Sequence, residues 1–147
     1  MFEKRDMELY LIDSPVKMEN AGKKLADALS GGDVVLLSGE LGAGKTVFCK
    51  GLAKGLGISS PVVSPTFTIM NEYVDGRIKL CHFDAYRLEN ADEALGAGLA
   101  DFIGDENTVC AVEWWENIRE LFENLNTVRV DIIKHDENTR LVKIKRN

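Results

Sequence analysis

The stretch VVLLSGELGAGKT, residues 34–46, determines the fold that this chain is predicted to adopt. Its first part, residues 34–38, is a continuous apolar run of the kind found in a strand covered on both faces. The second part, residues 39–46, matches the pattern G-x-x-x-x-G-K-[ST] of a phosphate-binding loop, or P-loop. Apolar residues then recur at four-residue spacing from 45 to 56, which predicts a helix. A strand, a glycine loop and a helix in this order are the context in which the pattern binds nucleotide phosphates.

The residue types in the loop explain how it would hold phosphate. Glycines permit positive φ angles, so that successive backbone N–H groups converge on one phosphate beside the positive end of the helix dipole. Lys45 would bridge the terminal phosphate oxygens and take part in catalysis, and the Thr46 hydroxyl would bind Mg²⁺. The predicted nucleotide-binding residues of the loop are Gly39, Glu40, Leu41, Gly42, Ala43, Gly44, Lys45 and Thr46.

Mg²⁺ and an attacking water require carboxylates, and two predicted strand ends supply them. Glu113 directly follows the apolar run VCAV and is assigned to Mg²⁺, while Asp84 is predicted to orient water or to help bind the metal. The alternative for each is an acid that only caps the end of a strand. Thr66, in the segment SPTFT at 64–68, is a candidate sensor of the terminal phosphate, although its prolines favour an ordinary crossing loop.

The remaining periodicity predicts one mixed α/β domain over residues 1–147. Strands are expected at residues 8–12, 34–38, 66–73, 78–83, 109–112, 127–134 and 140–146, and helices at 15–29, 45–56 and 89–98. The predicted fold class is α/β: a P-loop NTPase-like mixed sheet with central parallel strands, antiparallel hairpins and helices on both faces. Trp114 and Trp115, placed on a strand, should point to opposite faces, with one in the core. His82 is expected to be a hydrogen-bonded scaffold residue.

Composition limits the partners of the chain. Its 147 residues are 45% hydrophobic and 29% charged, which indicates a globular protein. The net charge of −6 disfavours direct binding of DNA or RNA, for which the best basic patch is Lys143, Lys145 and Arg146. Three separated cysteines predict buried, reduced thiols in a cytoplasmic protein. No apolar stretch approaches the roughly 20 residues that span a bilayer, so no membrane is expected as a partner.

Four motifs in order resemble those of the TsaE (YjeE) family. They are GELGAGKT at 39–46, SPTFT at 64–68 followed by NEY, HFDAYRL at 82–88 and EWWE at 113–116. The resemblance extends from about residue 14 to 140. It implies a cytoplasmic, Mg²⁺-dependent ATPase that uses ATP and works with TsaD and TsaB to form threonylcarbamoyladenosine (t6A) in tRNA. The tRNA would be reached indirectly, through the complex.

The resemblance also implies roles for individual residues. The magnesium ligands of the family map onto Thr46 and Glu113, and its catalytic acid maps onto Asp84. Its switch loop maps onto Ser64 to Phe67, which favours Thr66 as a phosphate or water sensor.

The same resemblance places Pro15 to Met18 and Arg140 near the nucleotide. Two positions depart from the family pattern. Trp115 stands where proline is common, and Val47 stands where a second threonine is usual.

Three other functions remain open on sequence grounds. A small-molecule P-loop kinase shares the loop, but it needs an acceptor pocket and usually an arginine-bearing lid, for which there is no insertion. A GTPase is suggested only by the D-x-x-G match at 101–104. A binding module gated by nucleotide, without essential turnover, is the non-enzymatic alternative. As an ATPase, the protein is expected to be slow until partner proteins complete its site.

Overall fold

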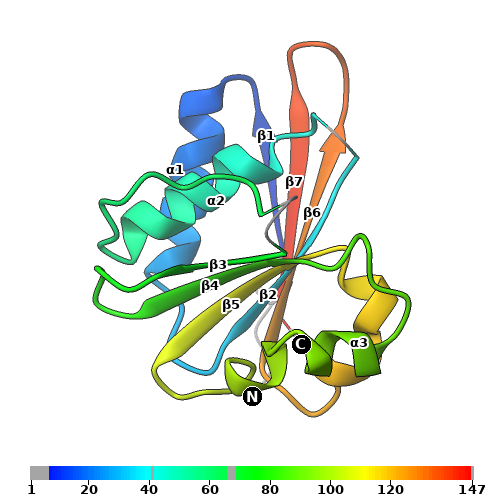
Figure 1. Cartoon of the computed structure of the whole chain (residues 1–147). Coiled ribbons are helices and arrows are strands. Elements are labelled where there is room, and N and C mark those ends of the chain that lie inside the picture. The colour runs from blue at the N-terminus through cyan, green and yellow to red at the C-terminus, as the bar shows by residue number, and fades with distance from the viewer. Residues whose placement is uncertain (1–6, 41, 66–68, 147) are drawn as a thin grey trace, which may run out of the picture.

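The computed structural model describes residues 7–40, 42–65 and 69–146, and it confirms the predicted α/β fold (Figure 1). One seven-stranded sheet has the order β1-β7-β6-β2-β5-β4-β3. The strands are β1 (Met7–Ile12), β2 (Val34–Ser38), β3 (Met70–Tyr73), β4 (Lys79–Asp84), β5 (Thr108–Glu113), β6 (Thr127–Lys134) and β7 (Arg140–Arg146). β2 lies parallel to β5 and β6, and β5 parallel to β4, whereas β1–β7, β6–β7 and β3–β4 pair antiparallel. The carboxyl ends of β2, β4 and β5 therefore meet at one edge of the sheet.

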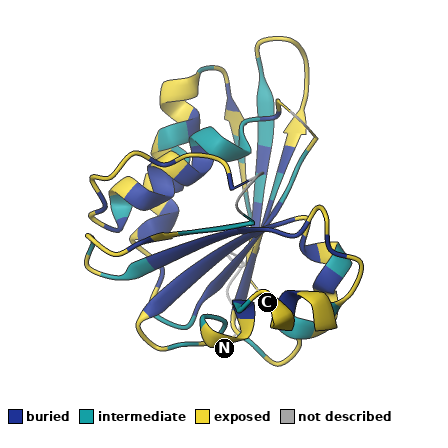
Figure 2. Ribbon diagram, viewed as in Figure 1, coloured by how far each residue is buried: buried dark blue, intermediate teal, exposed yellow. Residues whose placement is uncertain are grey.

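Helices cover both faces of the sheet. Helices α1 (Pro15–Ala26) and α2 (Lys45–Gly55) pack on one face, and α3 (Ala91–Gly96), η2 (Leu99–Asp101) and η3 (Trp115–Phe122) pack on the other (Figure 1). Alternate residues of β2 enter the two apolar cores, so Val34 to Leu37 are all buried (Figure 2). This is why the strand has a continuous apolar sequence rather than an alternating one.

Glycines allow α1 and α2 to approach each other closely. A Cβ atom at Gly51 would lie 1.8 Å from the carbonyl oxygen of Glu19, and one at Gly22 would lie 2.1 Å from that of Phe48. Each helix thus places a glycine against the backbone of the other. Since α2 begins at Lys45, this contact also fixes where the P-loop lies.

Two predictions about strands are wrong for the same physical reason. The strand expected from Thr66 begins at Met70, because Ile69 has a φ of 70°. Ile69 packs in the core beneath α3, whereas Tyr73 packs in the core beneath α2, so the two do not share a face. The prediction that Trp114 and Trp115 lie on a strand is wrong as well. Strand β5 ends at Glu113, because Trp114 has a φ of 57°, and Trp115 begins η3. A residue other than glycine that adopts the left-handed conformation cannot be recognised from the pattern of hydrophobic residues.

Other boundaries are shifted by a few residues. Helix α1 ends at Ala26 rather than near residue 29, and α3 spans residues 91–96, with Asn90 as its N-cap. Cys49, Cys81 and Cys110 are buried and not joined in disulfides, as expected. Within the described ranges, no helix is both long and apolar enough to cross a membrane.

Candidate active site

The P-loop connects β2 to α2 with the backbone conformation that its glycines predict. Gly42 and Gly44 have φ angles of 81° and 115°, which residues that carry a Cβ atom disfavour. Gly44 is the N-cap of α2 and supplies no side-chain acceptor, and the first amides of a helix have no partner within it. Those amides and the helix dipole are therefore available to an anion at the loop.

A cavity of about 760 Å³ opens on one side of the loop. Seven of the residues predicted from sequence line it: Glu40, Gly42, Gly44, Lys45, Thr46, Asp84 and Glu113. Asp84 and Glu113 are partners in the parallel register of β4 and β5, at the carboxyl ends of both strands. The sheet therefore brings together two carboxylates that are 29 positions apart in the chain.

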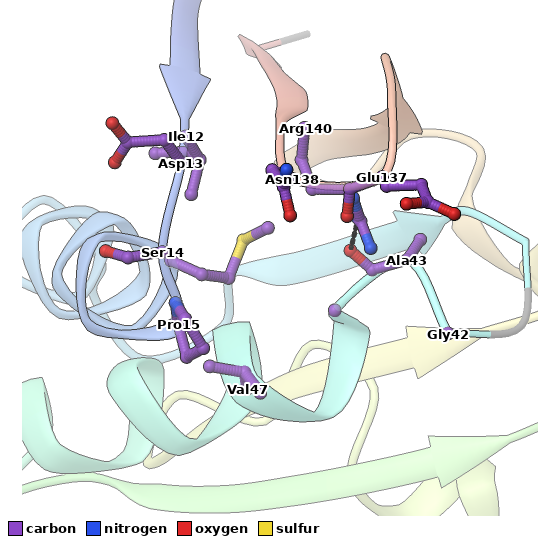
Figure 3. Close-up of a pocket in the computed structure, with 12 residues that line it drawn as sticks. Ile12, Asp13, Ser14, Pro15, Gly42, Ala43, Val47, Glu137, Asn138 and Arg140 are labelled. Carbon is purple, nitrogen blue, oxygen red and sulfur yellow. Dashed lines mark hydrogen bonds between the residues drawn. The ribbon is translucent and has the colours of Figure 1, made fainter.

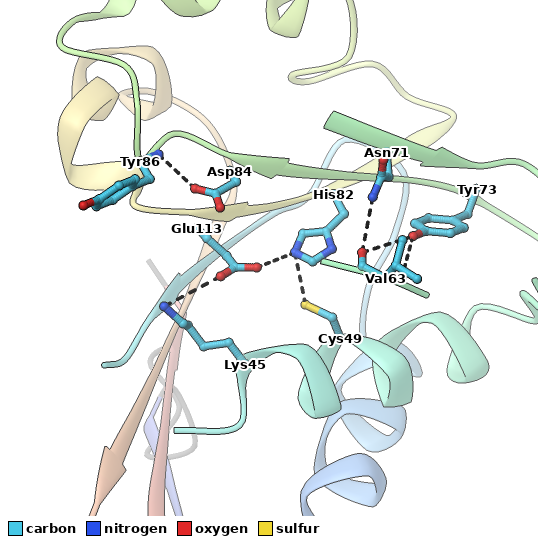
Figure 4. Close-up of polar contacts among 9 residues, drawn as sticks. All are labelled: Lys45, Cys49, Val63, Asn71, Tyr73, His82, Asp84, Tyr86 and Glu113. Carbon is cyan, nitrogen blue, oxygen red and sulfur yellow. Dashed lines mark hydrogen bonds and ion pairs between the residues drawn. The ribbon is translucent and has the colours of Figure 1, made fainter. Parts of the chain in front are cut away.

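Glu113 lies at the centre of a row of polar contacts (Figure 4). Its Oε1 atom is 3.7 Å from Nζ of Lys45, and its Oε2 atom is 2.7 Å from Nε2 of His82. Sγ of Cys49 lies 3.7 Å from the same histidine nitrogen. His82 is thus the hydrogen-bonded scaffold residue that the sequence suggested.

The groups in this row stabilise one another's charged forms. Burial raises the pKa of Glu113, but the hydrogen bond from His82 and the positive charges of His82 and Lys45 outweigh it, so the pKa lies below its usual value. Burial lowers the pKa of His82, but contacts with Cys49 and Glu113 outweigh it and raise the pKa well above its usual value. Glu113 is therefore an ionised carboxylate that faces the cavity.

The predicted metal ligands have the chemistry that Mg²⁺ prefers. Thr46, Asp84 and Glu113 offer one hydroxyl and two carboxylates to the same cavity, and Mg²⁺ binds oxygen ligands. Among the described residues, no three acidic, histidine or cysteine side chains converge tightly enough to form a metal site on their own. The donors therefore fit an ion held by a few side chains together with substrate phosphates.

Asp84 also has a structural role. Its Oδ1 atom accepts a hydrogen bond from the backbone N–H of Tyr86, 2.9 Å away. The side chain of Tyr86 contacts Trp114, with ring centroids 4.9 Å apart, and Nζ of Lys45 lies 5.5 Å from the Trp114 ring centroid. Both aromatic rings line the cavity. Sequence analysis had not assigned Tyr86 to the site, although it lies within the HFDAYRL motif.

A second cavity, of about 320 Å³, lies on the other side of the loop (Figure 3). Pro15 and Met18 at the start of α1 line it, as does Arg140 at the start of β7. Nε of Arg140 donates to the carbonyl oxygen of Ala43 over 3.2 Å. The structure therefore brings these three residues to the P-loop, together with Asp13 and Asn138, which the sequence had not indicated.

Several predicted residues lie outside this arrangement or outside the described ranges. Gly39 borders a smaller cavity next to the first, where an added Cβ would lie 2.8 Å from the carbonyl oxygen of Ile132. Leu41 and Thr66 are outside the described residues, so the predicted contact of Leu41 with nucleotide and the predicted sensor role of Thr66 remain predictions.

Comparison with known proteins identifies the family. The family model for "Threonylcarbamoyl adenosine biosynthesis protein TsaE" matches residues 12–142. The chain belongs to the TsaE family. The tRNA threonylcarbamoyladenosine biosynthesis protein TsaE of Nostoc sp. is 41% identical over 140 residues, which are 93% of this chain and 84% of that protein. The TsaE protein of Aquifex aeolicus is 38% identical over 138 residues, 92% of this chain and 94% of that protein.

A solved structure supports the same assignment. The crystal structure of YdiB from Bacillus subtilis matches this TsaE-family fold with a TM-score of 0.79 and 33% identity. The match covers 94% of this chain and 84% of that one. The solved structure therefore supports the fold, and the sequence comparisons place the family in t6A biosynthesis.

The departure at Trp115 from the TsaE pattern has a visible consequence. Trp115 begins η3 and is buried, whereas Trp114 is 43% exposed. Nε1 of Trp115 donates to Oγ of Ser38 over 2.9 Å, and the guanidinium groups of Arg119 and Arg129 lie 5.3 and 5.1 Å from its ring centroid. Trp115 thus ties the segment after Glu113 to the residue that precedes the P-loop.

Proposed function

We propose that this TsaE-family protein is a cytoplasmic, Mg²⁺-dependent ATPase that supports t6A modification of tRNA together with TsaD and TsaB. The main support is the position of Lys45 and Glu113, which face each other over 3.7 Å where the P-loop borders its larger cavity. A lysine for phosphate and a carboxylate for metal at the same loop are the two charges that nucleotide hydrolysis requires.

Different residues would bind the phosphates, the metal and the nucleoside, according to their chemistry. Loop amides and Lys45 would bind the phosphates, and Thr46 and Glu113, with help from Asp84, would hold Mg²⁺. A bound Mg²⁺ supplies positive charge that stabilises the phosphates as they react. The second cavity would take the base and sugar, next to Pro15 and Arg140.

Reconstitution of tRNA modification tests this function. Purified protein should bind Mg-ATP by calorimetry, release inorganic phosphate slowly, and be required for t6A formation when TsaD, TsaB and the other pathway components are present. Release of inorganic phosphate without labelling of an acceptor would separate the hydrolase from a small-molecule kinase. Absence of any heat of Mg-ATP binding would refute the proposal.

Asp84→Ala should separate hydrolysis from gating by nucleotide. Because the Asp84 carboxylate lines the cavity and is predicted to orient water, its loss should slow ATP hydrolysis by about 10²-fold or more. ATP affinity should change little, since Lys45 and the loop amides remain. If this variant still supports full t6A formation despite slow hydrolysis, turnover is not essential and the gated binding module is the better account.

Arg140→Ala should weaken nucleotide binding more than it slows the chemical step. Arg140 supports the loop through its 3.2 Å hydrogen bond to Ala43 and lines the second cavity, away from Lys45. We expect the Kd for ATP to rise about tenfold, which corresponds to a loss of about 1.4 kcal/mol in binding free energy. Calorimetry and single-turnover hydrolysis measure the two effects separately, and a loss confined to the single-turnover rate would contradict this role.

A further inference from the structure

His82 is a fully buried histidine that the proposed mechanism does not use. It lies two residues before Asp84 on β4, so both side chains point to the face of the sheet that α2 covers. Its Nε2 atom contacts Glu113 and Cys49, while its Nδ1 atom has no hydrogen-bond partner among the described residues. The ring is therefore held through one nitrogen, which faces Glu113.

The contacts of His82 connect the sheet to the P-loop helix. Lys45 and Cys49 are four residues apart on α2, on one face of the helix. Oε1 of Glu113 pairs with Lys45, and Oε2 of Glu113 contacts His82. The histidine in turn contacts Cys49. Side chains from α2, β4 and β5 thus form one continuous row of contacts (Figure 4).

The two oxygens of Glu113 are consequently not equivalent. Oε2 lies 2.7 Å from a ring that is 0% exposed, whereas Oε1 is directed to Lys45, which lines the cavity. A short hydrogen bond to a rigid buried donor restricts rotation of the carboxylate. Partners that orient a metal-binding carboxylate in this way commonly change metal affinity or activity by about 10- to 100-fold when they are removed.

We propose that His82 is a positioning residue for Mg²⁺, which holds Oε2 of Glu113 so that Oε1 stays turned toward Lys45 and the cavity, where it would be available to the metal. This inference rests on the proposed Mg²⁺-dependent ATPase activity. It differs from a purely structural role, because it predicts that His82 acts on the contribution of the metal and not on nucleotide binding as such.

Calorimetry with the non-hydrolysable analogue AMPPNP measures that contribution directly. For the wild type, affinity should be higher in Mg²⁺ than in EDTA. In His82→Phe, which keeps a buried ring but has no donor, this Mg²⁺-dependent gain should fall about 10- to 100-fold. The affinity in EDTA should stay within about threefold of the wild-type value. This change is smaller than the tenfold change in affinity that 1.4 kcal/mol of binding free energy produces.

A conservative pair of variants keeps the test decisive if His82→Phe does not fold. The amide nitrogen of His82→Gln can approach the position of Nε2 and should restore the gain to within about threefold of wild type, whereas the shorter His82→Asn should not. The matched control is Cys81→Ala, a fully buried neighbour on β4 that packs in the opposite core. It should lose stability but keep the wild-type Mg²⁺ effect.

The possible outcomes separate this inference from the proposed function. If the wild type shows no Mg²⁺-dependent gain, the proposed magnesium site itself is wrong. If the wild type shows the gain and His82→Phe retains it, or if Gln and Asn behave alike, the role of His82 is refuted. An equal loss in Cys81→Ala would also refute it, because the effect would then be one of general packing.

Discussion

Lys45→Ala is expected to reduce ATP hydrolysis by about 10²- to 10³-fold, the usual cost of removing a fixed charge that stabilises a transition state. The ammonium group lies where the P-loop borders the larger cavity, and its side chain is only 12% exposed. Its positive charge is therefore only weakly screened by water. Steady-state release of inorganic phosphate measures the effect, and t6A formation in the reconstituted system should fail with it.

The fold of this variant should remain intact. Lys45 is the first residue of α2, and its ion pair with Glu113 spans 3.7 Å, so its removal disturbs no apolar contact in the core. Lys50→Ala is the matched control, because it removes an exposed lysine from the same helix away from both cavities beside the loop. If both variants lose activity equally, the effect is one of helix charge and the assignment of Lys45 is wrong.

The bounds of helices and strands were predictable from sequence wherever a single local pattern, such as a buried apolar run or an alternation of apolar and polar residues, determines the element. The strand at 34–38 and the hairpin strands at 127–134 and 140–146 have the predicted bounds, because buried runs and alternating patterns follow strand geometry directly. Two of the errors fall at Ile69 and Trp114, where a single left-handed residue interrupts extended structure. Nothing in the side chains of isoleucine or tryptophan signals such a conformation.

The candidate site was predictable for the residues that follow strand ends, and less so for those that other elements bring in. Asp84 and Glu113 could be paired because parallel strands end at the same edge of a sheet. Asp13 and Asn138 reach the second cavity only because β1 and β7 lie side by side, a tertiary contact with no local sequence signal. The resemblance to the TsaE family supplied Pro15 and Arg140 where spacing could not.

Gly51→Ala is expected to destabilise the protein by about 3 kcal/mol, the upper part of the range for overpacked cores. In an isolated helix the same change would be favourable by about 1 kcal/mol, because alanine has the higher helix propensity. Here the new Cβ would lie 1.8 Å from the carbonyl oxygen of Glu19, a backbone atom that cannot move without the rest of α1. The steric overlap therefore outweighs the gain in propensity.

Thermal unfolding should show this loss as a decrease in Tm of about 10 °C, given the size of the chain. Gly96→Ala is the matched control, since Gly96 is also helical but a Cβ there meets no atom within 4 Å. It should leave Tm unchanged or raise it slightly. Relief of the overlap at Gly51 requires α2 to move away from α1, and α2 begins at Lys45, so ATP affinity should fall together with Tm. A Gly51→Ala protein with the wild-type Tm would show that the two helices are not in the close contact on which the position of the P-loop depends.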